Sequence, residues 1–255
     1  LGVAVAPGAK VIVALGVGFL AGLTATTPDM RHSVGVYYTD SRFMDLRIVS
    51  NLGLSGADLA AVRNVAGVER AAGAHTVDLE MVTDGGDTLT ARLHGVPDGD
   101  WGGDDADYLN RMTLVSGRWP ENPGEAVIEE QYRTYEQLND GGTLTLAAAS
   151  DDLGRTEFTV VGAVRSAYYV SAVQRGSTSV GNGRIGLIVY VCDSVFTMDC
   201  YTDIYAVVSG AAAEEGFSAA YDDAVAPVKD AGETLSETQK YIRRDALVVA
   251  AEQKL

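Results

Sequence analysis

The sequence predicts an α+β protein, with a β-α-β unit near its amino end, a strand-rich middle and a helix at its carboxyl end. Three observations support this fold class. A helix start with capping residues stands between two strand-like segments within residues 43–74. Short apolar runs separated by turn residues fill most of residues 75–209. From Ala211 onwards, the apolar residues recur at helical spacing.

An uncharged apolar run, VIVALGVGFLAGL, occupies residues 11–23. About 20 apolar residues span a bilayer, and the preceding LGVAVAPGA brings the segment near that length despite Lys10. We therefore expect residues 1–25 to be the end of a membrane helix or anchor. A signal-peptide remnant and a buried core helix are the alternatives, because both also contain short apolar runs.

The segment DMRHSVGVYYTDSR, residues 29–42, is expected to be helical, with Pro28 in the first turn and Asp29 near the positive end of the helix. The next segment, Phe43 to Ser50, alternates between apolar and polar residues and predicts a strand. Its apolar face carries Met44, Leu46 and Ile48.

The clearest local signal is the helix start at Ser55. Asp58 follows three residues later and completes a capping box, while Leu54 and Leu59 are placed as a hydrophobic staple. Gly67 is expected to end this helix in a left-handed conformation. The predicted helix is therefore only about three turns long.

Strands are predicted from Val68 to residue 209. Val68 to Ala74 is the first, and residues 75–96 form a hairpin whose loop is Asp84-Gly85-Gly86-Asp87. Further strand-like runs are MTLVSG, EAVIEE, GTLTLAAA, EFTVVGAVRSAYYVSAV, RIGLIVYVC and YTDIYAVVS. Their spacing is typical of antiparallel sheets.

The region after Ala211 is expected to be helical. Its first apolar residues share one face before Pro227, and they are Phe217, Tyr221 and Val225. Later apolar residues recur every seven positions, at Leu235, Ile242 and Val249. Because only two such intervals are visible, residues 236–255 could begin a coiled coil or form a single amphipathic helix.

Composition excludes two classes of partner. The chain has 255 residues, with 19 basic and 35 acidic side chains and a net charge of −16. Nucleic-acid binding needs clusters of Lys and Arg, so we expect no nucleic-acid partner. The same charge argues against lying flat on an anionic membrane surface. It fits a soluble module that is exposed to the medium.

Two cysteines, Cys192 and Cys200, are separated by seven residues. We expect a structural disulfide between them, which is permitted outside the cell, over two free thiols. A zinc site would need more ligands, and the histidines His32, His75 and His94 lie far away in sequence. His75 and His94 fall on strands and are expected to be structural.

No motif for catalysis or phosphate binding is present, because the chain lacks G-x-S-x-G, H-E-x-x-H and a Walker A sequence. The acidic loop 98–107 fails the EF-hand pattern, with Gly102 at position 5 and Leu109 at position 12. A solvated loop is expected there, and a weak irregular calcium site is the alternative. We expect no catalytic residue, no cofactor and no metal, and hence no enzyme.

Two tryptophans, Trp101 and Trp119, flank loops. Either could be an exposed anchor for a partner. Trp119 is expected in the core instead, because it follows a short strand and precedes Pro120.

Three segments resemble one family, the extracytoplasmic region of ABC-transporter permeases of the FtsX/MacB type. In that family a membrane helix passes into a strand, an "LGL-x-x-x-D" helix start and a "V-x-G-V" strand, followed by a "G-R-x-P" turn and an "F-x-V-V-G" strand. The matching residues are 11–68, 114–130 and 157–170. The resemblance is closest to the versions found in Gram-positive bacteria, in which a long coiled coil often follows.

The resemblance implies a porter-like β-α-β lobe built from residues 26–74 plus 201–235, with an inserted β-rich, sabre-like lobe at 75–200. An N-terminal apolar helix and a C-terminal helix at 236–255 would flank them. Because one membrane helix cannot build a transporter, we expect the chain to be a fragment.

The function that the resemblance implies is non-catalytic. The domain would couple ATP hydrolysis by a separate cytoplasmic subunit to export, or to a lipid, peptide or protein partner outside the cell membrane, and the full transporter could dimerise. A secreted or anchored cell-envelope hydrolase is the alternative.

Overall fold

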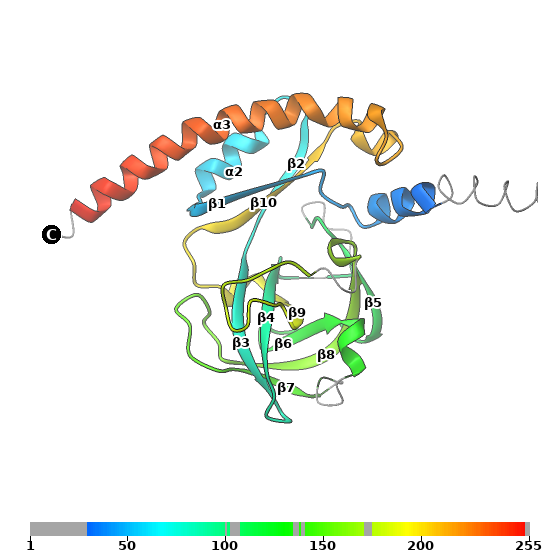
Figure 1. The fold of residues 1–255 in the computed structure, drawn as a ribbon, viewed down its shortest axis with the longest axis vertical. Helices are drawn as coiled ribbons and strands as arrows, with labels where there is room; N and C mark the ends of the chain where they lie inside the picture. The colour runs from blue at the N-terminus through cyan, green and yellow to red at the C-terminus, as the bar shows by residue number, and fades with distance from the viewer. Residues whose placement is uncertain are drawn as a thin grey trace, which may run out of the picture.

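A computed structural model of the chain describes residues 30–99, 101–102, 108–134, 138, 141–170 and 175–252. It confirms the α+β class, with a three-stranded sheet, a seven-stranded sheet and helices (Figure 1). The expected membrane anchor, residues 1–25, lies outside the described residues. Within the described ranges no helix combines the length and apolar character needed to cross a membrane.

The three-stranded sheet has the order β1-β10-β2, formed by Leu46–Leu54, Tyr201–Val208 and Val68–Ala74. The central strand β10 is antiparallel to both neighbours. Two helices, α2 (Gly56–Arg63) and α3 (Ala219–Glu252), lie on one side of the sheet (Figure 1). They cover a core made by Leu54, Leu59, Val62, Ala71, Ile204 and Ala206.

The capping box at the start of α2 is confirmed. The Ser55 backbone N–H donates to Asp58 Oδ2 at 2.7 Å, and the Asp58 N–H donates to Ser55 Oγ at 3.2 Å. The predicted end of the helix was wrong, because α2 stops at Arg63 with Asn64 as its cap. Gly67 has a φ of 93° and instead forms the turn into β2, where a Cβ would lie 2.7 Å from Val228 of α3.

The seven-stranded sheet has the order β5-β8-β6-β9-β4-β3-β7, and β7 also pairs with β8. All strands but β5 therefore close into a ring, which leaves few free edges. The strands are β3 (Thr76–Thr83), β4 (Thr88–Val96), β5 (Met112–Gly117), β6 (Glu125–Glu129), β7 (Thr143–Leu146), β8 (Glu157–Ser166) and β9 (Leu187–Cys192).

The interior of this ring is the largest apolar core of the described residues. Each residue of β9 is buried, which matches a strand with neighbours on both faces. The largest fully buried side chains include Phe158, Met81, Leu93, Ile128, Leu144 and Leu187.

Two strand pairs differ from the antiparallel arrangement that the spacing predicted. The hairpin β3–β4 is antiparallel as expected, but β4 pairs parallel to β9 and β6 pairs parallel to β8. Parallel neighbours need long crossover connections, and here the intervening strands provide them. The short spacing of the strands in the sequence therefore did not predict which strands pair in the sheet.

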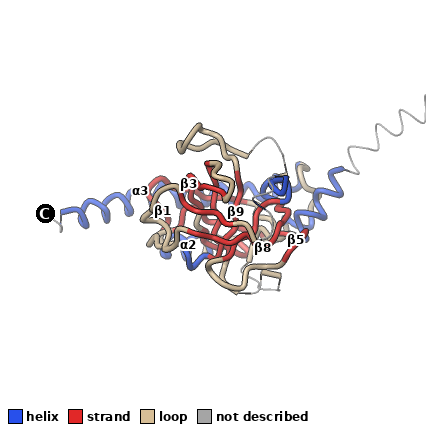
Figure 2. The backbone as a smooth tube through the Cα atoms, turned by 90° about the horizontal axis from the view of Figure 1, so that it is seen from below, coloured by secondary structure: helices blue, strands red, loops and turns tan. Residues whose placement is uncertain are grey.

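Two connections join the sheets. His75 alone links β2 to β3, and residues 193–200 link β9 to β10. The helical residues 30–40 and α3 both adjoin the three-stranded sheet and leave on opposite sides of the strands (Figure 2). The division into domains that the resemblance implies stays a prediction and is taken up below.

Two aromatic residues lie elsewhere than expected. Trp101 is buried, with its ring centroid 6.2 Å from that of Trp119, so it is a core residue and not an exposed anchor. Phe217 is exposed, has a φ of 64° and precedes α3, so it does not share a helical face with Val225. The helix continues through Pro227, which lies on its exposed side.

Candidate functional site

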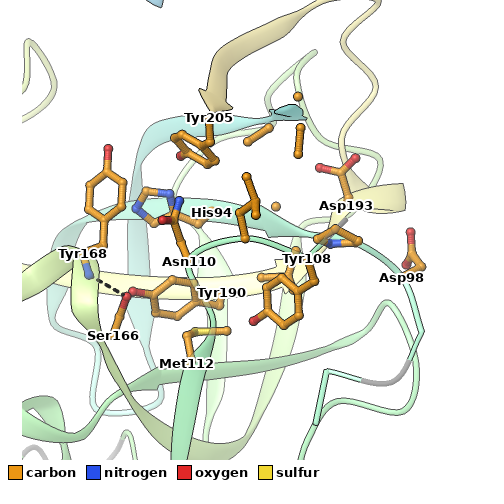
Figure 3. A pocket seen from close by; sticks show the side chains of 17 residues that line it. His94, Asp98, Tyr108, Asn110, Met112, Ser166, Tyr168, Tyr190, Asp193 and Tyr205 are labelled. Carbon is orange, nitrogen blue, oxygen red and sulfur yellow. Dashed lines mark hydrogen bonds between the residues drawn. The ribbon is translucent and has the colours of Figure 1, made fainter. Parts of the chain in front are cut away.

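A cavity of about 310 Å³ lies between the two sheets (Figure 3). The three-stranded sheet contributes a wall of small residues and one tyrosine, and the seven-stranded sheet and its loops contribute most of the aromatic and polar groups. The lining residues used below are Gly73, Tyr205, His94, Gly95, Asp98, Tyr108, Asn110, Tyr168, Tyr190 and Asp193.

Two glycines set the shape of this cavity. A Cβ at Gly73 would lie 2.6 Å from the ring of Tyr201, and a Cβ at Gly95 would overlap the carboxylate of Asp193. Larger residues at these positions would displace both neighbours. The glycines therefore let the strands approach the aromatic and acidic groups closely.

His94 is a structural part of the wall. Its Nε2 lies 2.6 Å from the Tyr169 hydroxyl, its Nδ1 lies 3.1 Å from Thr76 Oγ1, and its ring stacks on Tyr190. Burial lowers the pKa of His94 to about 3, with a smaller contribution from the positive charge of Arg92. The imidazole is therefore neutral at pH 7, and both ring nitrogens are already occupied.

His75 forms a contact between the two segments that connect the sheets. Its Nδ1 lies 2.8 Å from Asp193 Oδ1, and its ring stacks on Phe196, with centroids 5.3 Å apart. The next residue, Thr76, donates its backbone N–H to Thr202 Oγ1 at 2.8 Å. The first interaction joins the two connecting segments, and the second joins β3 to β10.

Three buried polar atoms in the lining have no hydrogen-bond partner among the described residues. They are the hydroxyls of Tyr108 and Tyr190 and the amide nitrogen of Asn110. Burial raises the pKa of both tyrosine hydroxyls, and the neighbouring Met112 backbone and Ser166 side chain offset part of this rise for Tyr108 and Tyr190 respectively. Asn110 uses its other side-chain atom, Oδ1, to accept from the Met44 N–H at 2.9 Å.

The two cysteines lie at the two ends of the connection between β9 and β10. Cys192 ends β9, and Cys200 precedes β10 and packs so closely on Gly53 that a Cβ there would overlap its sulfur. Both are free thiols, so the structure does not contain the disulfide that the spacing predicts, and the pairing stays a prediction for the oxidised protein. Burial raises the pKa of Cys192 to about 11.

No group of three or more His, Cys, Asp or Glu side chains in the described ranges is placed to hold a metal ion. Much of the acidic loop 98–107, where calcium was the alternative, lies outside those ranges. The described part includes Asp98, whose carboxylate accepts from the backbone N–H and hydroxyl of Ser194 at 3.0 and 2.8 Å.

Sequence reasoning did not find the unpartnered residues of the cavity. Tyr108, Asn110 and Tyr190 stand in separate segments, and no local pattern connects them. The only available signal was the composition, which has 12 tyrosines against 5 phenylalanines. An excess of hydroxylated rings indicates aromatic positions where a polar group is needed as well as an apolar one.

Comparison with protein-family models gives no match, and comparison with curated proteins gives none either. Among solved structures, the chain is similar to the extracellular domain of the noncanonic ABC-type transporter YknZ from Gram-positive bacteria. That similarity has a TM-score of 0.38 and 11% identity over 63% of this chain and 76% of the other.

The chain is also similar to the periplasmic region of MacB from Actinobacillus actinomycetemcomitans. The TM-score is 0.40, with 14% identity over 80% of this chain and 84% of the other. Because identity and TM-score are this low, the functional inference below rests on the chain's own residues.

Proposed function

We propose that this chain is the non-catalytic, extracytoplasmic domain of an ABC transporter permease of the FtsX/MacB type. Its outer lobe would move when a separate cytoplasmic subunit hydrolyses ATP, and this motion would act on a lipid, peptide or protein partner outside the membrane. The sequence resemblance supports the assignment. Its three segments include β1, α2, β6 and β8 and most of β5, and thus lie in both sheets.

One observation carries the mechanical part of the proposal: the seven-stranded sheet is joined to the rest of the chain only through His75 and residues 193–200. The helical segments 30–40 and α3 adjoin the other sheet. A force applied through these helices would therefore reach the seven-stranded sheet through two neighbouring connections, and also through the hydrogen bonds of residues 41–44 with Asn110 and Arg111. Such an arrangement suits a hinge, because hinges are a few residues at the ends of rigid elements.

We extend the proposal to two lobes, residues 26–74 plus 201–235 and residues 75–200. Each sheet has its own apolar core, which supports a division at the connections. The hydrogen bond from the Thr76 N–H to Thr202 Oγ1, at 2.8 Å, crosses this division and would help to hold the lobes in the orientation seen here.

The alternative, a hydrolase of the cell envelope, would need free acid and base groups beside a cleft. Asp98 and Asp193 are the carboxylates that line the cavity, but Asp98 caps Ser194 and Asp193 binds His75. His94 has both nitrogens occupied. No arrangement of these residues favours hydrolysis, so binding and motion remain the proposal.

Labelling of intact cells tests the location. Val170 is 63% exposed at the end of a 3-10 turn on the seven-stranded side, so a cysteine there would be accessible. The variant Val170→Cys, made with Cys200→Ser in the full-length protein, should react with a membrane-impermeant maleimide in intact cells. The Cys200→Ser protein alone is the control, because Cys192 is buried. Reaction only after lysis would place the domain in the cytosol and contradict the proposal.

A further inference from the structure

A second and larger hollow, a groove of about 870 Å³, lies on the three-stranded sheet. Val207 of β10 and Arg70 of β2 pair with each other and form its sheet side. They alternate along their strands with the residues that pack under α2, so the groove is on the opposite face from that helix. Its walls are the helical residues 30–40 and the segment 211–217, which leads into α3.

Large apolar side chains of these walls are exposed to solvent. Phe217 is 62% exposed and Val36 is 47% exposed, and both line the groove. Phe217 comes close to the other wall, with its ring centroid 6.3 Å from that of Tyr38. No other phenylalanine or tryptophan of the described residues is exposed. An exposed ring beside a groove is typical of the aromatic anchors of interfaces.

The backbone supports a binding role for this ring. Phe217 has a φ of 64°, a conformation that is sterically disfavoured for a bulky residue and that Gly or Asn adopts more readily. Because the ring is mostly exposed, its packing does not explain why a phenylalanine stands there. Among the described residues, three that are not glycine have a positive φ, and two of them, Arg42 and Phe217, line this groove. Such strained residues cluster at ligand clamps and switch regions.

The groove is also acidic. Its lining contains six carboxylates and three arginines, and one of the arginines, Arg70, lies 3.4 Å from a carboxylate oxygen of Glu69. Four of the carboxylates are exposed and form no ion pair with any residue that the structure describes. They are Asp40, Glu214, Glu215 and Asp222.

This charge decides between the possible occupants. A second copy of the chain would bring a net charge of −16 to an acidic rim. Nucleic acid and an anionic lipid surface would be repelled in the same way. A cationic partner with an apolar face would satisfy both the carboxylates and the exposed ring. Amphipathic helices bind in this manner, with the apolar face in a groove and the charged face toward the rim.

We propose that the groove binds a basic, amphipathic helix of a partner protein. The apolar face of that helix packs on Phe217 and Val36, and its Lys and Arg side chains lie against Glu214, Glu215 and Asp222. The groove would thus be a docking site for a partner of the kind included in the proposed function. The binding itself does not require the transporter assignment, so this proposal and the location of the domain are tested by separate experiments and can fail separately.

Fluorescence anisotropy titrations of the purified chain with three labelled synthetic peptides test the proposal. The first peptide places leucine and lysine on opposite faces of a helix. The second replaces each lysine by glutamate, and the third replaces each leucine by serine. The Leu/Lys peptide should bind, and each of the other two should bind at least about tenfold more weakly, because each lacks one of the two required features.

The variant Phe217→Asn separates binding from folding. Asn tolerates a positive φ, so the melting temperature should stay unchanged or rise. Affinity for the Leu/Lys peptide should fall by about tenfold or more, because the anchoring ring is lost. A residue with a merely structural role would not lose affinity while keeping its stability.

A pair of double variants tests the contribution of the rim. Glu214→Gln with Glu215→Gln removes two charges from the groove and should weaken binding of the Leu/Lys peptide about three- to tenfold. The matched control, Asp151→Asn with Glu157→Gln, removes two exposed charges from the seven-stranded sheet and the turn before it. It should leave the affinity within about twofold of the wild type.

Several results would overturn the proposal. One is equal binding of the Leu/Lys and Leu/Glu peptides, and another is wild-type affinity in Phe217→Asn. Equal losses in the two double variants would show that the peptide is attracted only by the overall negative charge. A wild-type dimer in analytical ultracentrifugation that Phe217→Asn converts to monomers would show that a second copy fills the groove instead.

Discussion

The two sheets of this protein obtain their cores in different ways. The seven-stranded sheet closes on itself, and its interior is filled by its own strands, such as the fully buried β9. The three-stranded sheet depends on other elements on both faces: Leu59 of α2 and Leu235 of α3 help to cover one face, and Leu109 and Tyr168 pack on the other. The first can therefore act as a rigid body on its own, whereas the second depends on helices that connect it to the rest of the chain.

The difference also appears in the buried charges. The seven-stranded sheet encloses the ion pair Glu129–Arg175, whose side chains are 5% and 9% exposed. In the three-stranded sheet, Asp203 is buried but its partner Arg47 is 41% exposed. When both charges of an ion pair are buried, removing one is costly, because the remaining charge cannot be hydrated. In the three-stranded sheet, loss of Asp203 should cost less stability, because Arg47 is exposed and can be hydrated.

The largest expected effect is the loss of a core ring from the closed sheet. Phe158 is 1% exposed, so Phe158→Ala should lower the free energy of unfolding by about 3–5 kcal/mol in urea titrations. Val36→Ala, at a position that is 47% exposed, is the control and should change it by less than about 0.5 kcal/mol. Equal effects of the two variants would mean that the closed core does not form.

Breaking the buried ion pair should have a similar but slightly smaller effect. Glu129→Gln leaves the Arg175 guanidinium buried without its counter-charge and should cost about 3 kcal/mol. Glu130→Gln is the matched control, because Glu130 pairs with Arg165 at a solvent-exposed position. If both variants lose the same small stability, the Glu129–Arg175 pair is hydrated and the comparison between the sheets is wrong.

The buried histidine makes stability fall in acid. The folded-state pKa of His94 is about 3, below its usual value of 6.5. Between these two pH values the imidazole is therefore protonated in the unfolded chain and neutral in the folded protein. Between pH 6.5 and pH 5, this difference should remove about 2 kcal/mol of stability. Glu129 has the opposite effect on stability as the pH falls. Burial raises its folded-state pKa, although Arg175 opposes that shift, so the folded protein binds this proton more readily than the unfolded chain.

Comparison of the wild type with His94→Gln isolates this effect, since the other titrating groups cancel. Urea titrations at pH 7 and pH 5 should show that the wild type loses about 2 kcal/mol more than the variant over this interval. Parallel pH profiles for the two proteins would show that His94 is protonated in the folded state.

The smallest expected effect concerns the helix that supports the three-stranded sheet. Ser55→Ala removes the capping box of α2 and should cost about 1 kcal/mol, measured by thermal unfolding. Ser55→Thr keeps a hydroxyl acceptor and should retain most of the stability. A cost as large as that of Phe158→Ala would mean that α2 supports much more of the molecule than its length suggests.

Local chemistry predicted the elements that depend on neighbours in sequence. The capping box at Ser55 and the hairpin of β3 and β4 involve partners only a few residues apart, and both are confirmed. The resemblance, and not the pattern, predicted that a strand near residue 201 returns to the first strands of the chain.

The remaining features depend on contacts between distant residues. The ring closes through β7 and β8, and β4 lies parallel to β9, which is almost a hundred residues later. Trp101 lies within the acidic loop 98–107, where the sequence predicts solvent exposure, yet it packs on Trp119. The cavity needs residues from both sheets, so no single segment of the sequence contains its pattern.

The central claim is that the two sheets change their relative orientation when ATP is used. Spin labels at Val49→Cys and Val170→Cys test it, because these residues are 59% and 63% exposed and stand on opposite sides of the connections. The native cysteines are replaced by alanine, and electron–electron distances are measured in the full permease. The account predicts that the distance distribution shifts when ATP is added. An unchanged distribution in an actively hydrolysing transporter would contradict it.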